Sequence, residues 1–189
     1  MKYSFSIALT LLLFACNNQN QQQASNKDTN ASGSLAANTK TFRSDTMRCS
    51  FEYPLEWSLN YNNQTGKSAS MVEPLTDSTD RFGARFNIWA EYLPVPITDS
   101  MYGLAAMSQI KVANNGMTVN NEGKKQFGTN SFRSFSFNFS MEDQSEYAVR
   151  GFTLIQDSIG YNISFTAERE QINNYSATIE KMLTSFKTH

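Results

Sequence analysis

Histidine is almost absent from this chain of 189 residues, because its one histidine is the last residue, His189. A Ser-His-Asp or Cys-His catalytic arrangement needs an imidazole that a third group holds rigidly, and a chain terminus frays. A zinc site of the usual type lacks ligands for the same reason. The sequence has no CxxC, GxGxxG or GxxxxGK[ST] motif either. We therefore expect no catalytic residues, no metal site and no cofactor, and we predict that the protein is not an enzyme.

An excess of charge of one sign is also missing. The 16 Lys and Arg residues balance 17 Asp and Glu residues, and no basic stripe with interleaved aromatic residues is present. A surface that binds nucleic acid needs such a stripe. We expect no nucleic acid among the partners of this protein.

Apolar runs long enough to span a membrane are lacking, and the longest run is residues 5–14 near the N-terminus. A spanning helix needs roughly 20 apolar residues, whereas a secretory signal peptide has a shorter apolar region. The run ends in Leu13-Phe14-Ala15-Cys16, which resembles the lipobox of bacterial lipoproteins. We predict a signal peptide over residues 1–15 and lipid on Cys16. An ordinary signal peptide that is cut elsewhere, or a short buried helix, is the alternative.

The segment after Cys16 has almost nothing to bury. Residues 17–40 contain one leucine and no aromatic residue, and they are rich in Asn, Gln, Ser and Ala. Such a composition favours disorder, and about 24 flexible residues have an end-to-end distance of roughly 25–30 Å. We interpret residues 16–40 as a lipidated tether. The anchor could face the periplasm or the cell exterior. Because Asn-Asn-Gln follows Cys16, rather than the acidic run that resembles a surface-export tag, we expect the periplasmic face of the outer membrane.

Residues 41–189 have the length of one domain. Cys49 is their only cysteine, so the domain has no internal disulfide. Met47, Cys49 and Phe51 share one face of an alternating segment, and we expect Cys49 to pack as a small hydrophobic residue rather than to react.

Strict alternation of apolar and polar residues predicts most of the strands. These are 57–62, 68–73, the segment from Arg81 with Phe82 to Tyr92 on one face, 135–141, 147–156 and 161–167. Helical spacing predicts two helices. The first is capped by Thr98 or Asp99 and buries the stripe Met101, Leu104, Ala105, Ser108 and Val112; the second buries Ile172, Tyr175, Ile179, Met182, Leu183 and Phe186. Short links between strands indicate an α+β fold with a mainly antiparallel sheet.

Trp89 interrupts the polar face of its strand, where Asn87 and Glu91 are its neighbours. A helix or loop that covers the sheet could bury it, since an α+β sheet can be covered on both faces. The functional alternative is an aromatic contact with a partner or ligand. Replacement by Ser separates the two, because loss of binding without loss of stability favours the contact.

Asp followed by Ser or Thr recurs through the chain, and in four cases Met, Thr or Ile comes next. The sequence resembles an O-glycosylation sequon of exported bacterial proteins. Asp-Ser and Asp-Thr also favour turns and helix caps, which is the local alternative. The candidate glycosylation sites are Thr46, Ser78, Ser100 and Ser158.

Phe51-Glu52-Tyr53-Pro54-Leu55-Glu56-Trp57 resembles the FxYPxxW opening of PsbP-like domains, a family that includes envelope lipoproteins of the DcrB-like kind. A closing helix that ends in Ser185-Phe186 agrees with this resemblance, which covers about residues 42–187. It implies an α/β/α sandwich with two packed helices, in which Pro54 ends the first strand and Trp57 fills the core. Family members are mostly binding or assembly proteins.

We therefore predict a non-enzymatic, membrane-anchored module of the bacterial envelope that binds or assembles with an envelope protein. The alternative is a small-ligand carrier with a pocket between sheet and helix.

Overall fold

The computed structural model describes residues 38–61, 66–75, 82–113, 117–141 and 144–189, which all belong to one unit, Leu35–His189. The predicted signal peptide and Cys16 lie outside the described residues, as does most of the tether. The described strands are β1 (Thr39–Ser44), β2 (Cys49–Pro54), β3 (Ser58–Tyr61), β4 (Ser68–Val72), β5 (Arg85–Tyr92), β6 (Asn120–Phe127), β7 (Asn130–Ser140), β8 (Glu146–Gln156), β9 (Ile159–Glu168) and β10 (Lys187–Thr188).

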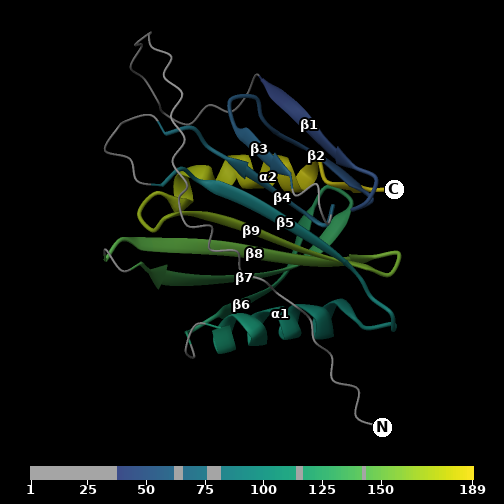
Figure 1. Cartoon of the computed structure of the whole chain (residues 1–189). Coiled ribbons are helices and arrows are strands. Elements are labelled where there is room, and N and C mark those ends of the chain that lie inside the picture. The colour runs from purple at the N-terminus through teal and green to yellow at the C-terminus, as the bar shows by residue number, and fades with distance from the viewer. Residues whose placement is uncertain (1–37, 62–65, 76–81, 114–116, 142–143) are drawn as a thin grey trace. The chain divides into compact units, whose positions relative to one another are not determined.

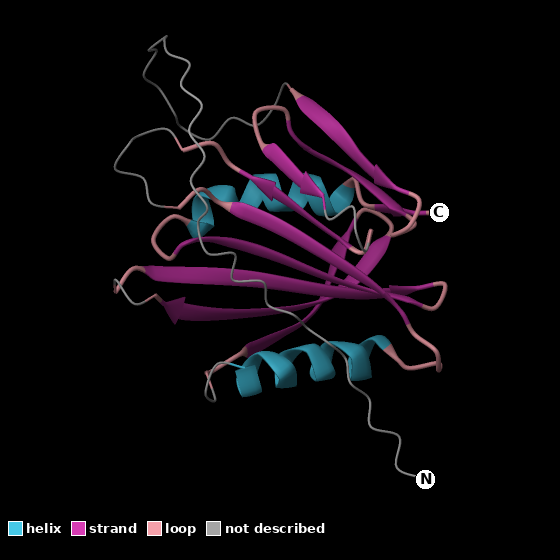
Figure 2. Cartoon of the chain, viewed as in Figure 1, coloured by secondary structure: helices cyan, strands magenta, loops and turns pink. Residues whose placement is uncertain are grey.

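These strands form two antiparallel sheets. One sheet has seven strands in the order β3-β4-β5-β9-β8-β7-β6, and the other has three in the order β1-β2-β10. The helices are α1 (Asp99–Ala113) and α2 (Ser176–Thr184), and a 3-10 turn, Ile172–Tyr175, precedes α2. The predicted α+β class with a mainly antiparallel sheet and two packed helices is confirmed (Figures 1 and 2).

The two helices lie on opposite faces of the seven-stranded sheet (Figure 1). Thr153 of β8 faces Gly103 of α1. Arg150, three residues earlier on the same strand, donates a 3.0 Å hydrogen bond to the hydroxyl of Ser176 at the start of α2. Successive side chains of a strand point to opposite faces, so these contacts place α1 and α2 on different sides.

The main core lies between the seven-stranded sheet, the three-stranded sheet and α2. Phe51 of β2 packs against Phe86 of β5, with ring centroids 5.2 Å apart, and Trp57 packs against Phe165 of β9 at 6.0 Å. Strand β2 ends at Pro54 and Trp57 is buried. The predicted burial of Trp57 is confirmed, and Pro54 ends a strand as predicted, although this strand is the second and not the first, because β1 precedes it.

Both ends of the domain pair with β2, and the sequence does not predict either pairing. Strand β1 begins at Thr39, two residues before the predicted start of the domain. At the other end, the backbone N–H of His189 donates a 3.1 Å hydrogen bond to the carbonyl of Arg48. In return, Nε of Arg48 donates a 2.9 Å hydrogen bond to the carbonyl of His189. The expectation of a frayed C-terminus was wrong, because β10 holds this end by backbone pairing with β2.

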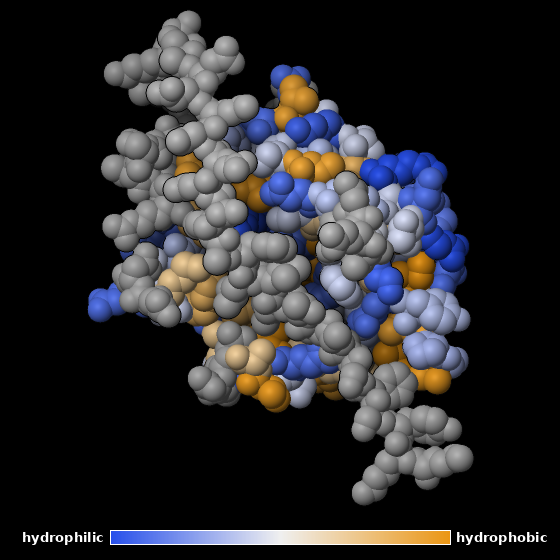
Figure 3. All heavy atoms as spheres, in the orientation of Figure 1, coloured by the Kyte–Doolittle hydropathy of each residue, from blue (hydrophilic) through white to orange (hydrophobic). Residues whose placement is uncertain are grey.

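Helix α1 exists where it was predicted, but it buries the other face. The residues that pack on the sheet are Tyr102, Gly103, Ala106, Met107 and Ile110. The predicted stripe points outward, with Leu104 53% and Val112 80% exposed, and Figure 3 shows apolar side chains at the surface where Figure 1 places α1. Tyr92, which the alternation places on one face with Phe86 and Ile88, is 72% exposed at the end of β5.

In the part of the chain that the structure describes, no helix is long and apolar enough to cross a membrane.

Candidate functional site: the sheet face around Trp89

Trp89 lies on the α1 side of the seven-stranded sheet, in the half formed by β4, β5 and β9. The strand register places it between Ser68 of β4 and Asn162 of β9. In the next row on the same face, Asn87 lies between Ser70 and Ser164. We call this surface the Trp89 face; it consists of Ser68, Ser70, Asn87, Trp89, Asn162 and Ser164.

All six side chains of the Trp89 face are half-buried rather than covered. Helix α1 packs on β7 and β8, so the described helix on this side lies over the other half of the sheet. Within the described residues, the Trp89 face has one hydrogen bond between its own side chains, from Nδ2 of Asn87 to Oγ of Ser164 at 3.5 Å. The face therefore presents polar groups with remaining hydrogen-bonding capacity next to one indole.

Arg85 and Glu91 of β5 lie on the same face, at either end of the pair of rows. The guanidinium of Arg85 stacks over the ring of Phe82, 4.6 Å from its centroid. The carboxylate of Glu91 accepts a 2.9 Å hydrogen bond from the hydroxyl of Tyr102. Burial, together with the charge of Glu91 and this hydrogen bond, raises the pKa of Tyr102 well above its ordinary value.

Two glycines let α1 pack closely on the sheet, beside the Trp89 face. A Cβ at Gly103 would collide with the side chain of Arg133, and one at Gly160 would collide with the ring of Tyr102. Thr98 caps the start of α1, because its Oγ1 accepts a 3.2 Å hydrogen bond from the backbone N–H of Met101. Asp99, the other predicted cap, instead accepts a 3.1 Å hydrogen bond from the backbone N–H of Ile155.

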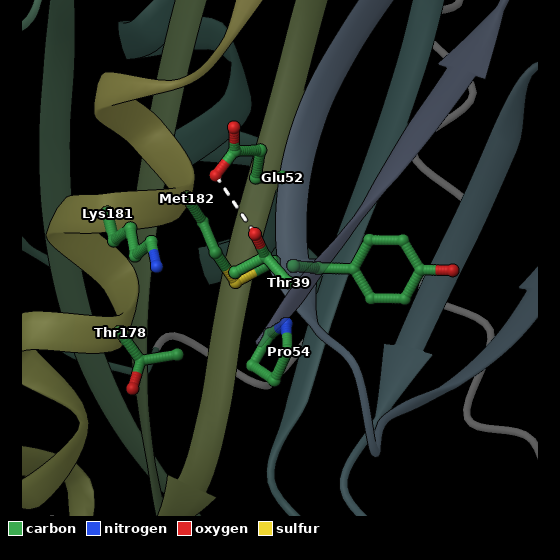
Figure 4. A pocket seen from close by; sticks show the side chains of 7 residues that line it. Thr39, Glu52, Pro54, Thr178, Lys181 and Met182 are labelled. Carbon is green, nitrogen blue, oxygen red and sulfur yellow. Dashed lines mark hydrogen bonds between the residues drawn. The ribbon is translucent and has the colours of Figure 1, made fainter. Parts of the chain in front are cut away.

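A pocket lies between the three-stranded sheet and α2, where the ligand-carrier alternative places one. Side chains from β1, β2 and α2 line it, and Oγ1 of Thr39 donates a 3.1 Å hydrogen bond to the carboxylate of Glu52 (Figure 4). Its volume is about 10 Å³, which is space for roughly one water molecule. Sites for small organic molecules occupy roughly 300–1,000 Å³, so this pocket is too small for one.

Cys49 is completely buried, and burial raises the pKa of its thiol from 9.0 to about 12. The thiolate is the reactive form of cysteine, so a thiol in this state is inert near neutral pH. The prediction that Cys49 packs as a small hydrophobic residue is confirmed. Among the described residues, no group of three or more His, Cys, Asp or Glu side chains could hold a metal ion.

The candidate glycosylation sites differ in their surroundings. Thr46 and Ser158 are exposed in the turns after β1 and after β8, and Ser158 has a positive φ of 62°. Ser100 is half-buried, and its hydroxyl accepts a 3.1 Å hydrogen bond from Nη2 of Arg133. Ser78 lies outside the described residues. The turn positions suit both alternatives, a glycan and a purely local role of the Asp side chains.

No protein-family model matches the sequence, and no curated protein is a significant relative of it. Solved structures do match. The solution structure of cyanobacterial PsbP (CyanoP) from Synechocystis sp. PCC 6803 is similar with a TM-score of 0.54 and 9% identity, over 88% of this chain and 98% of that one. The chain has the PsbP-like fold. The architecture that the FxYPxxW element implied is thereby confirmed.

Two further structures share this PsbP-like fold. LpqN, which is involved in cell envelope biogenesis of Mycobacterium tuberculosis, has a TM-score of 0.55 and 11% identity over 82% of this chain and 88% of its own. A crystal structure from Bacteroides thetaiotaomicron VPI-5482 has a TM-score of 0.54 and 19% identity over 79% of this chain. The present chain spans about half of that protein, 48% of its length. A common fold does not transfer function.

Sequence reasoning singled out Trp89 and its neighbour Asn87 but missed the other four polar residues of the Trp89 face. The structure pairs Trp89 with Asn162, which is distant in sequence, whereas Thr46 and Ser158 lie in turns. Ser68, Asn162 and Ser164 each belong to alternating strands in which they look like ordinary solvent-facing residues. Strand order alone reveals that they form one surface.

Proposed function

We propose that the domain is a non-enzymatic binding module of the bacterial cell envelope, and that the Trp89 face contacts its partner. The observation that carries this proposal is the position of Trp89, half-buried between Ser68 and Asn162 on a sheet face that α1 leaves to one side. Tryptophan is strongly enriched among residues that dominate binding energy. A half-buried tryptophan leaves part of its apolar ring in contact with water, which is unfavourable in free energy. A partner that covers the ring would remove this contact, so the position of Trp89 is consistent with a role in recognition.

LpqN gives an example of the PsbP-like fold in a protein of cell envelope biogenesis, which supports the envelope part of the proposal. In our proposal, lipid on Cys16 anchors the chain at the periplasmic face of the outer membrane. The tether gives the domain reach toward its partner. Mass spectrometry of the mature N-terminus tests the anchor, and an unmodified Cys16 would contradict it.

The carrier alternative receives no support from the pocket beside α2, because a volume of about 10 Å³ cannot hold a small organic ligand. We therefore retain the binding module as the proposed function and the surface, rather than an internal cavity, as its site.

Crosslinking in intact cells, followed by affinity purification of the full chain, tests the proposal. We expect the wild type to retain a stoichiometric partner and Trp89→Ser to lose it. Tyr92→Ser is the matched control, because Tyr92 is an exposed aromatic residue at the end of the same strand. This control should retain the partner.

Thermal unfolding of the same variants separates binding from folding. Trp89→Ser should unfold near the wild-type temperature if Trp89 serves recognition. A large fall in melting temperature would assign Trp89 to the core instead. A partner that both variants retain equally would place the contact elsewhere on the domain.

A further inference from the structure

We propose that the Trp89 face binds a neutral polysaccharide of the cell envelope. This inference rests on the proposed function, because it names the chemistry of the partner that the same face contacts. The argument uses the charge of the face, its hydrogen-bonding groups and its continuation to the edge of the sheet.

The six residues of the Trp89 face carry no ionisable group. Arg85 and Glu91, which lie beyond the two rows on β5, have opposite charges. The guanidinium of Arg85 stacks over Phe82, while its buried Nε has no hydrogen-bond partner among the described residues, and Glu91 accepts a hydrogen bond from Tyr102. A face without net charge gives no electrostatic attraction to a polyanion or a polycation. A neutral ligand matches this surface.

The hydrogen-bonding groups of the face suit hydroxyl groups on the ligand. Ser hydroxyls both donate and accept, the Asn162 amide does both through different atoms, and the Trp89 indole N–H donates. Within the described residues, the side chains of Ser68, Ser70 and Asn162 have no hydrogen-bond partner. Sugar hydroxyls also donate and accept, so a polysaccharide can satisfy all of these groups. The indole ring offers a flat apolar surface for the C–H groups of a sugar ring.

A polymer fits the shape of the face better than a compact molecule does. Neighbouring strands are about 4.8 Å apart, so each row spans roughly 10 Å across three strands. The row of Ser70, Asn87 and Ser164 continues to Asn60 of β3, which pairs with Ser70 and is exposed at the sheet edge. An extended chain can therefore lie along the row and leave the sheet over its edge.

An apolar protein surface is a poorer match for the same residues. The centre of a protein interface is typically apolar and aromatic, and serine is depleted there. Covering Ser68, Ser70 and Asn162 with apolar groups would leave their hydroxyl and amide groups without partners, which carries a desolvation cost.

Native affinity electrophoresis of the detergent-solubilised full chain tests the proposal. The gels contain β-glucan, mannan, amylopectin, glycol chitin or neutral polysaccharide extracted from the envelope of the source cells, with dextran sulfate as a polyanion. We expect at least one neutral polysaccharide to retard the wild type. Trp89→Ala should weaken binding about tenfold or more, and Asn162→Ala should weaken it roughly two- to tenfold.

Tyr92→Ala and Asn138→Ala are the matched controls. Asn138 is an exposed asparagine on β7 whose side chain lies on the opposite face of the same sheet. Both controls should bind like the wild type. Intrinsic fluorescence gives a second readout, because Trp57 is buried in the core and only the Trp89 emission should respond to the polysaccharide.

Retardation by no neutral polysaccharide, retardation that Trp89→Ala leaves unchanged, or retardation by dextran sulfate alone would overturn the inference. Loss of a crosslinked protein partner from Trp89→Ser without any polysaccharide binding would overturn it too, while the proposed function would stand with a protein as the partner. A dimer that depends on Trp89 would assign the face to a second copy of the chain.

Discussion

The hydroxyl of Tyr161 donates a 2.9 Å hydrogen bond to the backbone carbonyl of Met47, and so joins β9 of the seven-stranded sheet to the turn between β1 and β2. Both residues are buried. The same hydroxyl also lies 3.2 Å from the carbonyl of Arg48. This side chain thus links the three-stranded sheet to the seven-stranded sheet, in addition to the contact between Phe51 and Phe86.

Tyr161→Phe should lower the free energy of unfolding by about 1–3 kcal/mol, because the buried carbonyl of Met47 loses its donor. Urea unfolding measures this change. Tyr92→Phe is the control, since Tyr92 is largely exposed, and it should leave the unfolding midpoint unchanged. Equal midpoints for the two variants would show that the hydrogen bond contributes nothing.

Stability should fall in alkali. Burial raises the pKa of Cys49 from 9.0 to about 12, and burial followed by the neighbouring Cys49 raises that of Tyr161. A group whose pKa is raised by folding contributes fully below its unfolded pKa and loses that contribution as pH rises toward its folded pKa. The free energy of unfolding should therefore decrease from about pH 9 upward.

Urea unfolding at several pH values between 7 and 11 measures this dependence. Cys49→Ala should flatten the decrease, because the variant has no thiol to ionise at this position. A pH profile identical to that of the wild type would show that the thiol does not contribute to the alkaline loss.

The outward stripe of α1 should tolerate truncation, contrary to its pattern in the sequence. Leu104→Ala should change stability by less than about 1 kcal/mol, since Leu104 is 53% exposed. Met107→Ala, on the buried face of the same helix, should cost about 2–5 kcal/mol through the cavity that it leaves. Chemical unfolding of both variants compares the faces, and a larger loss for Leu104→Ala would reverse the assignment.

Glycosylation, if the Asp-Ser and Asp-Thr motifs direct it, should occur at Thr46 and Ser158 and not at Ser100. The first two are exposed in turns, whereas the Ser100 hydroxyl is hydrogen-bonded to Arg133. Intact mass and peptide mapping of protein from its native cells measure this. A mass equal to polypeptide plus lipid would end the idea, and the Asp residues would then have only local roles.

The strands of the main core were predictable from alternation, because one face of each packs against a continuous core. Phe86, Ile88 and Ala90 of β5 are buried as the pattern predicts, and so are Tyr161, Ile163 and Phe165 of β9. The closing helix was predictable for the same reason, since it buries Ile179, Met182 and Leu183 on one face.

The buried face of α1 was not predictable from spacing, because the helix has two apolar stripes with helical period. Met101, Leu104 and Val112 form one, and Tyr102, Met107 and Ile110 form the other. The second stripe packs inward because Gly103 permits close approach to Arg133 and Tyr102 reaches Glu91. Both reasons are tertiary contacts that no local pattern contains.

Three strands were missed because their pairing depends on the backbone rather than on side chains. Strand β6 has Phe127 as its single large apolar residue. Strand β10 has two residues and pairs with a segment far away in the sequence. Strand β1 begins inside the polar segment that was assigned to the tether. The Trp89 face escaped prediction likewise, since it depends on the order of β4, β5 and β9.

The pairing of β1 with β2 and one ring contact in the core also define a mechanical path from the proposed anchor to the proposed site. Tension on the segment before Thr39 would enter the fold through β1, which pairs with β2 along all six of its residues. From β2, the contact between Phe51 and Phe86 passes the load to β5. Strand β5 also carries Trp89, three residues further along. A pull between membrane and partner would thus be resisted by three strands in series, and α1 would lie outside the line of force.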